Sequence, residues 1–228
     1  MTLIKSISGI RGIVGGKSGE GLTPIDVVKF AAAYGTWLRR TNPKNLKVVI
    51  GRDARLSGEM VSRLVAGALQ GVGLNVLDLG LSTTPTVEIA VTMEKAGGGI
   101  ILTASHNPIQ WNALKLLNQE GEFISEEEGT EILRIADEED FIFVDVKKLG
   151  NYSENDTYLH KHVDHILALP LVDVEAITKA NFRIVVDSVN STGGIAVPLL
   201  LEALGVQTKN IKKGYLNFHP DSPSRQIL

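Results

Sequence analysis

A serine in a short polar loop is the residue of this chain whose position best suits chemistry. Ser105 lies in Thr-Ala-Ser-His-Asn-Pro, residues 103–108, directly after the apolar run 100–102. That run predicts a brief buried strand, and in an open α/β sheet ligands bind just beyond the carboxyl ends of strands. Two interpretations remain open: a ligand-binding loop, or a turn whose serine and asparagine satisfy local backbone groups.

Two cations could assist this loop if its chemistry is phosphoryl transfer, one of the reactions that these residue types permit. Phosphoryl transfer needs in-line positioning and dispersal of negative charge rather than much covalent help from the protein. Arg11 can bind phosphate oxygens in a bidentate way, and Lys115 can return toward Ser105 after a turn. His106 and Asn107 would shape the loop or hydrogen-bond the phosphoryl group. Either cation alone is more simply a surface charge, but together with the serine loop they form a candidate site.

Alternating strands and helices must position these residues. The sequence Thr23-Pro24-Ile25-Asp26 is a clear helix start, with Thr23 as the cap, and Ser57 is the expected cap of a second helix. Arg11 is expected in a loop that interrupts an N-terminal strand. This order predicts an α/β fold with a mixed, mostly parallel sheet layered by helices. Strands are expected at 47–50, 75–79, 100–102 and 113–117, and helices at 23–40, 58–70, 84–95 and 125–136.

The chain is predicted to contain two α/β units. Residues 1–140 form the first, which carries the serine loop; residues 141–157 are a linker; and residues 158–228 form a second, partial unit. Around and within the second unit, helices are expected at 156–169, 172–180 and 195–204, a buried strand at 182–187, and a loop or disordered tail at 214–228.

Composition narrows the function classes. The 228 residues carry a formal net charge of −3, and aromatic residues make up 5%, so we expect no nucleic-acid partner. There are no cysteines, which excludes disulfides, thiolate metal sites and a cysteine nucleophile. With neither a signal-peptide core nor a membrane-spanning apolar stretch in view, we expect a cytoplasmic protein without a membrane partner. The oligomeric state is left open.

Three other motifs suggest different sites, each incompletely. Gly16-Lys17-Ser18 looks like the end of a phosphate-binding P-loop, but position 11 holds arginine where the first glycine is required. His162 and His165 can share one helix face, but two histidines leave a tetrahedral zinc site incomplete, and His160 points elsewhere. No nucleophile-elbow pattern surrounds Ser105, which disfavours a serine hydrolase.

Three ordered motifs resemble those of the α-D-phosphohexomutases, the family of phosphoglucomutase, phosphomannomutase and phosphoglucosamine mutase. The serine loop with Asn112 and Lys115 resembles the family's active-site loop. Residues 9–12, Gly-Ile-Arg-Gly, resemble its N-terminal arginine loop, and residues 51–57, Gly-Arg-Asp-Ala-Arg-Leu-Ser, resemble its second signature. Asp53 and Arg55 of that signature are expected to brace the loops.

The resemblance implies an intramolecular phosphotransferase that interconverts hexose 1-phosphates and 6-phosphates of glucose, mannose or glucosamine. It implies that Ser105 carries the phosphoryl group, that Lys115 assists proton transfer or stabilises charge, and that a hexose 1,6-bisphosphate is the intermediate. It also implies Mg²⁺, held by the phosphoserine oxygen and three aspartates of a later Asp-Gly-Asp loop.

This sequence departs from that pattern, because it contains no Asp-x-Asp. We therefore expect the N-terminal part of a longer mutase, inactive alone but able to bind phosphate or sulfate near Ser105 and Arg11. The alternative is a non-catalytic module that binds phosphosugars or is regulated by phosphorylation. The preferred hexose is left open.

Overall fold

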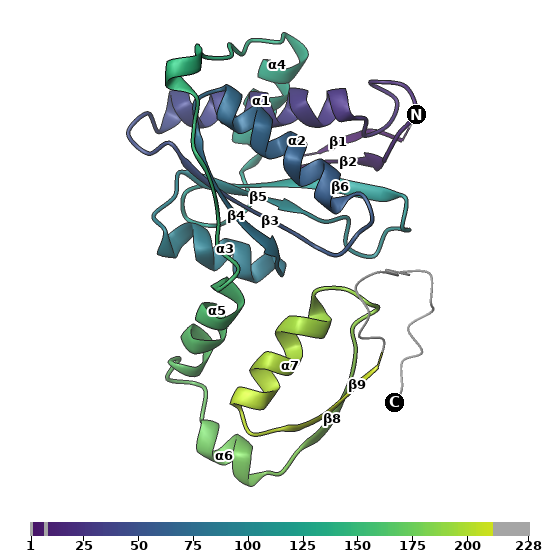
Figure 1. Cartoon of the computed structure of the whole chain (residues 1–228), viewed down its shortest axis with the longest axis vertical. Coiled ribbons are helices and arrows are strands. Elements are labelled where there is room, and N and C mark those ends of the chain that lie inside the picture. Colours follow the sequence, from purple (N-terminus) through teal and green to yellow (C-terminus); the bar gives the residue numbers. More distant parts are fainter. Residues whose placement is uncertain (1, 7–8, 212–228) are drawn as a thin grey trace.

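A seven-stranded mixed sheet forms the centre of the larger unit (Figure 1). The structure is a computed structural model that describes residues 2–6 and 9–211, so the predicted tail at 214–228 lies outside the described residues. The sheet order is β1-β2-β6-β5-β3-β4-β7, and β3, β4, β5 and β7 are parallel while β1, β2 and β6 add antiparallel pairings. The predicted mixed α/β sheet is confirmed. The strands are β1 Ile4–Ser6, β2 Gly9–Ile13, β3 Lys47–Arg52, β4 Asn75–Leu81, β5 Gly98–Leu102, β6 Trp111–Leu117 and β7 Tyr152–Glu154.

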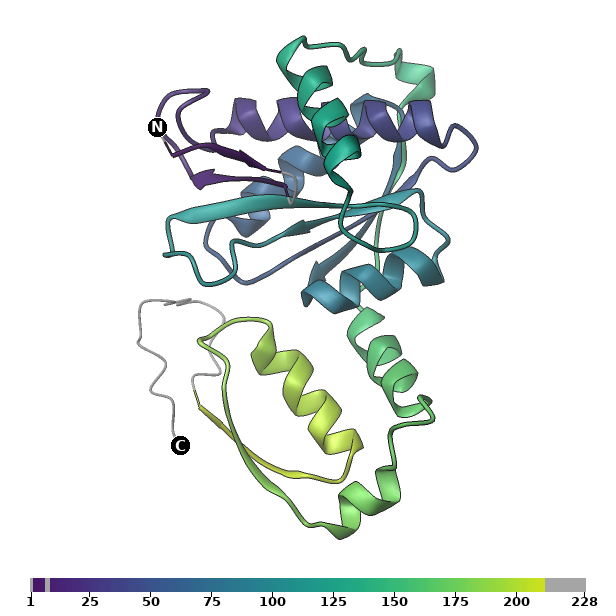
Figure 2. The same ribbon diagram turned by 180° about the vertical axis from the view of Figure 1, so that it is seen from behind.

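Helices cover both faces of this sheet. Figures 1 and 2 show α1, α2 and α4 on one face and α3 on the other, with α5 leading from α3 to the second unit. The side chains of the strands alternate between two cores accordingly, as a period of two requires. Val48, Ile50 and Ile100 enter the core under α1 and α2, whereas Val49 and Ile101 enter the core under α3. The bounds are α1 Pro24–Thr41, α2 Gly58–Gly71, α3 Thr84–Met93, α4 Glu126–Asp137 and α5 Tyr158–Leu167.

The starts of α1 and α4 follow the local sequence signals, whereas the start of α2 does not. Thr23 with Asp26 and Ser125 with Glu128 form reciprocal capping boxes at α1 and α4. Ser57 precedes α2 as predicted, but its side chain makes no cap hydrogen bond. Its hydroxyl instead accepts a 2.9 Å bond from the side-chain amide of Asn112 on β6. The expected cap is therefore wrong, because a tertiary partner takes the hydroxyl.

The segment predicted as a linker, 141–157, contains an edge strand of the main sheet. Its β7 pairs in parallel with β4, and a 3₁₀ turn at Val146–Lys148 precedes it. All three β7 residues are exposed, so no apolar alternation marks this strand in the sequence. The placement of the domain boundary stays a prediction, but 152–154 complete the first unit's sheet rather than merely connecting two units.

The described part of the second unit is a small parallel βαβ element. Strands β8 Arg183–Asp187 and β9 Gln207–Ile211 pair in parallel through α7 Gly193–Ala203, after the short helix α6 Val174–Lys179. The strand predicted at 182–187 is confirmed as β8, but its predicted burial is wrong, since Ile184 is 36% and Val185 56% exposed. Its apolar run is typical of a central strand, but among the described residues this sheet has two strands and one crossover helix. No sequence signal predicted the strand β9.

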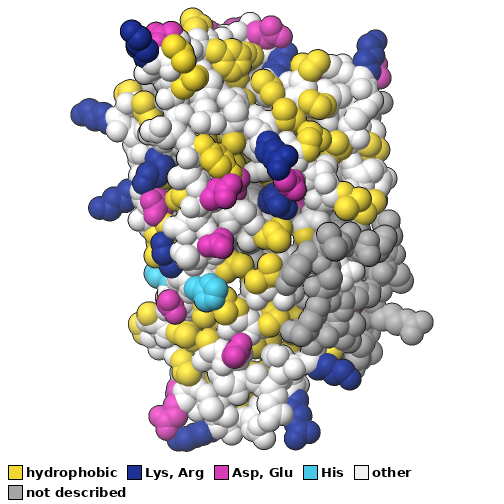
Figure 3. Space-filling model, in the orientation of Figure 1, with side chains coloured by type: hydrophobic (Ala, Val, Ile, Leu, Met, Phe, Trp, Pro, Cys, Tyr) yellow, Lys and Arg dark blue, Asp and Glu magenta, His cyan; other side chains and the backbone are white. Residues whose placement is uncertain are grey.

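The surface carries interspersed charges. Figure 3 shows positive and negative side chains side by side on the pictured face, as the small net charge suggests. Within the described ranges, no group of three or more metal-capable side chains is found, and His162 instead contacts the Thr86 hydroxyl through Nδ1 at 2.9 Å. No helix of the described chain has the length and apolarity needed to cross a bilayer.

Close packing beneath β5 gives a direct test of this fold. A Cβ on Gly98 would lie 2.6 Å from the Leu117 carbonyl oxygen and would also meet the Tyr34 hydroxyl. We expect Gly98→Ala to lower the free energy of unfolding by about 1–3 kcal/mol, because overpacking must displace Tyr34. The matched control is Gly67→Ala on the open side of α2, where a Cβ meets nothing within 4 Å. That change should stabilise the helix by roughly 0.5–1 kcal/mol in urea denaturation. Equal effects at the two sites would contradict the packing.

Candidate active site at the carboxyl edge of the sheet

The site lies where the sheet reverses its winding. β3 lies between β4 and β5, and the crossovers that leave β3 and β4 pass over opposite faces through α2 and α3. The loops after β3 and β5 therefore open beside each other at the carboxyl ends of their strands. This is the position at which open α/β sheets bind ligands. The loop after β3 holds Asp53 and Arg55, and the loop after β5 holds Ser105.

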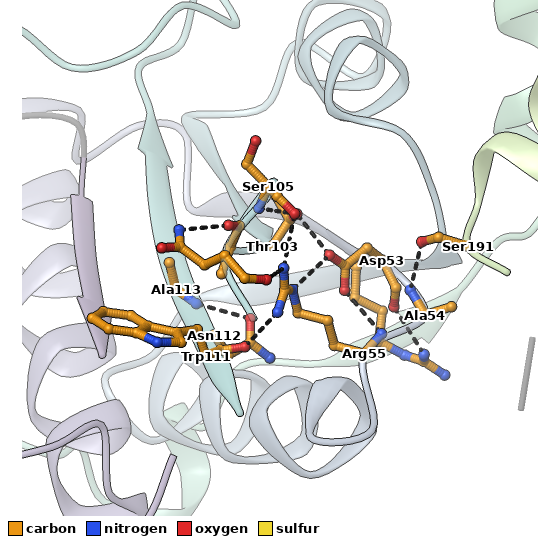
Figure 4. Close-up of polar contacts among 12 residues, drawn as sticks. Asp53, Ala54, Arg55, Thr103, Ser105, Trp111, Asn112, Ala113 and Ser191 are labelled. Carbon is orange, nitrogen blue, oxygen red and sulfur yellow. Dashed lines mark hydrogen bonds and ion pairs between the residues drawn. The ribbon is translucent and has the colours of Figure 1, made fainter. Parts of the chain in front are cut away.

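The guanidinium of Arg55 holds the serine loop from inside. Its side chain is fully buried (0% exposed), and all five of its N–H donors are used. Nη2 donates to the carbonyl oxygens of Ser105 and Asn107 at 2.8 Å each, and Nη1 donates to those of Pro108 and Trp111 at 2.9 Å each. Figure 4 shows the guanidinium between the loop and Asp53. One side chain thus fixes four carbonyl groups of the loop.

Asp53 compensates the buried charge of Arg55. Its Oδ2 accepts from Arg55 Nε at 3.2 Å and from the Thr103 hydroxyl at 2.7 Å, and its Oδ1 accepts from the Arg55 amide at 3.0 Å. Burial raises the pKa of the Asp53 carboxyl, and the bonds from Thr103 and Arg55 oppose that rise. Burial likewise lowers the pKa of Arg55, against the Asp53 charge. The expectation that Asp53 and Arg55 brace the loops matches this geometry.

The backbone of Ser105 has the left-handed conformation, with φ of 54°. This conformation is uncommon for residues other than glycine, and here the Arg55 bonds and a 3.2 Å bond from the Ser105 amide to the Thr103 hydroxyl hold it. The side chain is exposed and points away from Arg55 (Figure 4). The sharp turn also brings His106 Nδ1 to 3.5 Å from Ser105 Oγ, although side chains of adjacent residues are expected to diverge. Asn107 closes the turn, since its amide and its side chain both donate to the Ala104 carbonyl, at 3.0 and 2.8 Å.

The antiparallel half of the sheet supplies the cations. β2 pairs with β6 so that Arg11 lies opposite Ala113, and Lys115 follows two residues later on the same face of β6. The intervening Leu114, like Ile10 on β2, enters the core under α1, so Arg11 and Lys115 project from the opposite face. Arg11 therefore lies within a strand, and the expected loop at this residue is wrong. Gly9 and Gly12 of this strand allow close approach of its neighbours: a Cβ on Gly9 would collide with the Leu114 carbonyl, and one on Gly12 would crowd the backbone of Leu22.

One cavity of about 220 Å³ brings these groups together. All five residues predicted from the sequence line it, and their chemical roles stay predictions. Little in the sequence marks the other lining residues as part of a site, and the largest of them is Phe123. Among the described residues that line the cavity, none is acidic, so its electrostatic character is cationic. The lining comprises Ser6, Gly9, Arg11, Thr103, Ala104, Ser105, His106, Asn107, Ala113, Lys115 and Phe123.

The described residues do not by themselves fit a magnesium ion. Mg²⁺ prefers a near-octahedral set of oxygen ligands that includes carboxylates, and no carboxylate lines the cavity within the described ranges. The carboxylate of Asp53 is already committed to Arg55 and Thr103. Any metal at Ser105 would need acidic ligands from outside these residues, and no step below depends on it.

The Thr103 hydroxyl is a point at which the brace can be tested. Thr103→Val keeps the shape of the side chain but removes the bond to Asp53 and the acceptor of the Ser105 amide, which should lower the free energy of unfolding by about 1–3 kcal/mol. Loss of that bond raises the folded-state pKa of Asp53 further, which penalises the ionised form. The deficit relative to the unmodified protein should therefore grow as the pH rises above the ordinary carboxyl value of 3.8.

Chemical denaturation at several pH values measures this difference. The control is Thr92→Val, which removes an exposed hydroxyl that, among the described residues, donates to the Ile89 carbonyl of its own helix. A deficit for Thr103→Val that shrinks on going from acid to neutral pH would contradict the assigned network.

Comparison with known proteins identifies a family and several relatives. The family described as phosphoglucomutase/phosphomannomutase, alpha/beta/alpha domain I, matches residues 3–143. A phosphoglucosamine/phosphogalactosamine mutase of Sulfurisphaera tokodaii is 35% identical over 204 residues, which cover 89% of this chain and 43% of that protein. A phosphoglucomutase/phosphomannomutase of Thermococcus kodakarensis is 34% identical, with 93% of this chain and 44% of that protein covered.

A solved structure has a similar overall fold. The crystal structure of a putative phosphomannomutase from Thermus thermophilus superposes with a TM-score of 0.80 at 27% identity, covering 96% of this chain and 48% of that one. The chain thus spans less than half the length of these relatives.

Proposed function

This chain belongs to the phosphoglucomutase/phosphomannomutase family, and from that premise we propose that Ser105 carries a phosphoryl group exchanged with a hexose phosphate. The proposed reaction interconverts a hexose 1-phosphate and a hexose 6-phosphate through a bisphosphorylated sugar. The observation that supports it best is the convergence of Ser105, Arg11 and Lys115 on one cavity. A phosphoserine carries close to two negative charges, and a phosphosugar brings a second dianion, so cations must surround the transfer.

The geometry suits the serine to this role for a specific reason. The Arg55 bonds hold the loop by its carbonyl groups, which leaves the Ser105 side chain directed outward and exposed. A phosphoryl group on Oγ can then project into the cavity without disturbing the buried brace. Arg11 can bind its non-bridging oxygens as a fork, and Lys115 can neutralise charge beside the sugar.

The proposed step balances atoms and protons. A sugar hydroxyl attacks the phosphorus, the bond between phosphorus and Ser105 Oγ breaks, and the new bond joins phosphorus to the sugar oxygen. The sugar hydroxyl loses its proton, and Oγ regains one, so that the serine is neutral again. His106 Nδ1, 3.5 Å from Oγ, is positioned to exchange that proton. The reverse step rephosphorylates Ser105 from the other position of the bisphosphorylated sugar.

Two parts of this proposal rest on residues beyond those described. Mg²⁺ would join the phosphoserine oxygen only with carboxylates supplied from elsewhere, and most of the grip on the sugar is expected there too. Orientation of the substrate alone can contribute several kcal/mol to lowering a barrier. We therefore propose that these 228 residues alone bind phosphate compounds but turn them over far more slowly than a complete mutase.

Anion binding by the chain itself tests this proposal. We expect inorganic phosphate and glucose 6-phosphate to bind in titration calorimetry, and Arg11→Ala or Lys115→Ala to weaken each by about 10- to 100-fold, since a charge-assisted hydrogen bond contributes roughly 1.5–3 kcal/mol. The matched control is Lys179→Ala on α6, an exposed lysine paired with Glu175, which should change neither affinity.

Phosphopeptide mapping then tests the carrier. Protein purified from its source cells, or treated with hexose 1,6-bisphosphate and Mg²⁺, should carry phosphate on Ser105 and lose it in Ser105→Ala. Phosphate on another serine, or anion binding that survives both cation substitutions, would overturn the proposed function.

A further inference from the structure

An exposed aromatic ring forms part of the wall of the Ser105 cavity. Phe123 is 41% exposed, although a phenyl ring gains free energy from burial, and it lines the cavity together with Arg11 and Lys115. It belongs to none of the three sequence motifs that point to the site. An aromatic side chain left accessible inside a ligand cavity is typical of a surface that a ligand covers.

The backbone holds this ring in a defined place. After β6 the chain turns back on itself, and Phe123 forms an antiparallel bridge with Leu117. The Ile124 amide donates to the Leu116 carbonyl at 3.2 Å, and the Asn118 side chain accepts from the Glu120 and Glu122 amides at 3.0 Å each. The ring is thus carried by a hydrogen-bonded turn attached to the same strand that bears Lys115. A preorganised ring loses little conformational entropy when a ligand covers it.

The ring and the lysine together present two different surfaces. The ammonium nitrogen of Lys115 lies 5.7 Å from the centre of the Phe123 ring, within the range of a cation–π contact. One wall of the cavity therefore combines a positive charge with an apolar, flat face. A free phosphate ion matches only the charge. A phosphorylated sugar ring matches both, because its phosphate is anionic and one face of a pyranose consists of C–H groups.

We propose that Phe123 is a specificity-determining residue that packs against the C–H face of a pyranose ring while Lys115 and Arg11 bind the phosphate that the sugar exchanges with Ser105. This inference rests on the proposed function of the Ser105 site. Phe123 would select cyclic sugar phosphates over phosphate compounds that lack a flat apolar face. The contact is apolar, so it distinguishes ring from chain rather than one hexose from another.

Calorimetric titration of the 228-residue chain with three probes tests the proposal. The probes are glucose 6-phosphate, sorbitol 6-phosphate, which has an open chain, and inorganic phosphate. Phe123→Leu should weaken glucose 6-phosphate by roughly three- to tenfold, the range expected for loss of one aromatic contact. The other two affinities should stay unchanged. Phe123→Trp should retain the preference for the cyclic sugar phosphate.

The outcomes separate the possible failures. The matched control is Phe143→Leu, a 50% exposed phenylalanine beside Gly71 at the end of α2, which should leave all three affinities as they are. Equal weakening of all three probes by Phe123→Leu would mean that the ring only holds Lys115, and would overturn the proposal. Unchanged glucose 6-phosphate affinity would also overturn it, while leaving phosphate binding at Ser105 intact. If the unmodified chain bound none of the probes, the proposed function itself would fail.

Discussion

The contacts of one buried guanidinium with four loop carbonyls are the constraint on which the site depends. Arg55 donates to the carbonyl oxygens of residues 105, 107, 108 and 111 and so supplies buried hydrogen-bond donors to an irregular segment of the chain. Asp53 balances the charge, so the brace is a satisfied network rather than a buried ion. Breaking one partner of such a network leaves the other charge uncompensated. The irregular loop, and the unusual backbone of Ser105 within it, can therefore persist at the surface.

The parallel and antiparallel parts of the mixed sheet place different groups of the site. The parallel half presents the loops after β3 and β5 at one edge, which is where Arg55 meets the Ser105 loop. The antiparallel half, β2 and β6, places Arg11 and Lys115 on the same face of the sheet, where both line the cavity that contains Ser105. β6 joins the halves, since it follows the serine loop directly and pairs with both β5 and β2. Ser105 and the two cations thus come from different halves of the sheet that share one connecting strand.

Local signals in the sequence predicted local structure well. The caps at Thr23 and Ser125 depend on residues three positions apart, so spacing alone identifies them. The candidate site was also predictable, because its five residues lie in or beside recognisable motifs. Features fixed by distant partners were not. Ser57 bonds to Asn112 rather than to its own helix, and β7 is recruited by the free edge of β4 despite its exposed side chains.

Further cases show that sequence patterns do not reveal contacts with distant parts of the chain. The apolar run at Ile184 and Val185 predicted burial, but burial is decided by what covers a strand and not by its composition. Phe123 belongs to no recognisable motif, because a turn of the chain, and not its sequence neighbours, places it beside Lys115. Arg55 could be predicted as a brace, whereas the four carbonyls that it holds could be identified only in three dimensions.

Hydrogen exchange in Arg55→Lys tests the role of this brace most directly. Lysine keeps the positive charge but lacks the planar fork that reaches several carbonyls at once. We predict that the amides of Ser105 and Asn107 exchange at least about tenfold faster, the factor that corresponds to ~1.4 kcal/mol of easier local opening, while the Ile100 and Ile101 amides of β5 keep their protection. Unchanged exchange at Ser105 and Asn107, in a variant whose β5 amides remain protected, would contradict the claim that Arg55 shapes the loop.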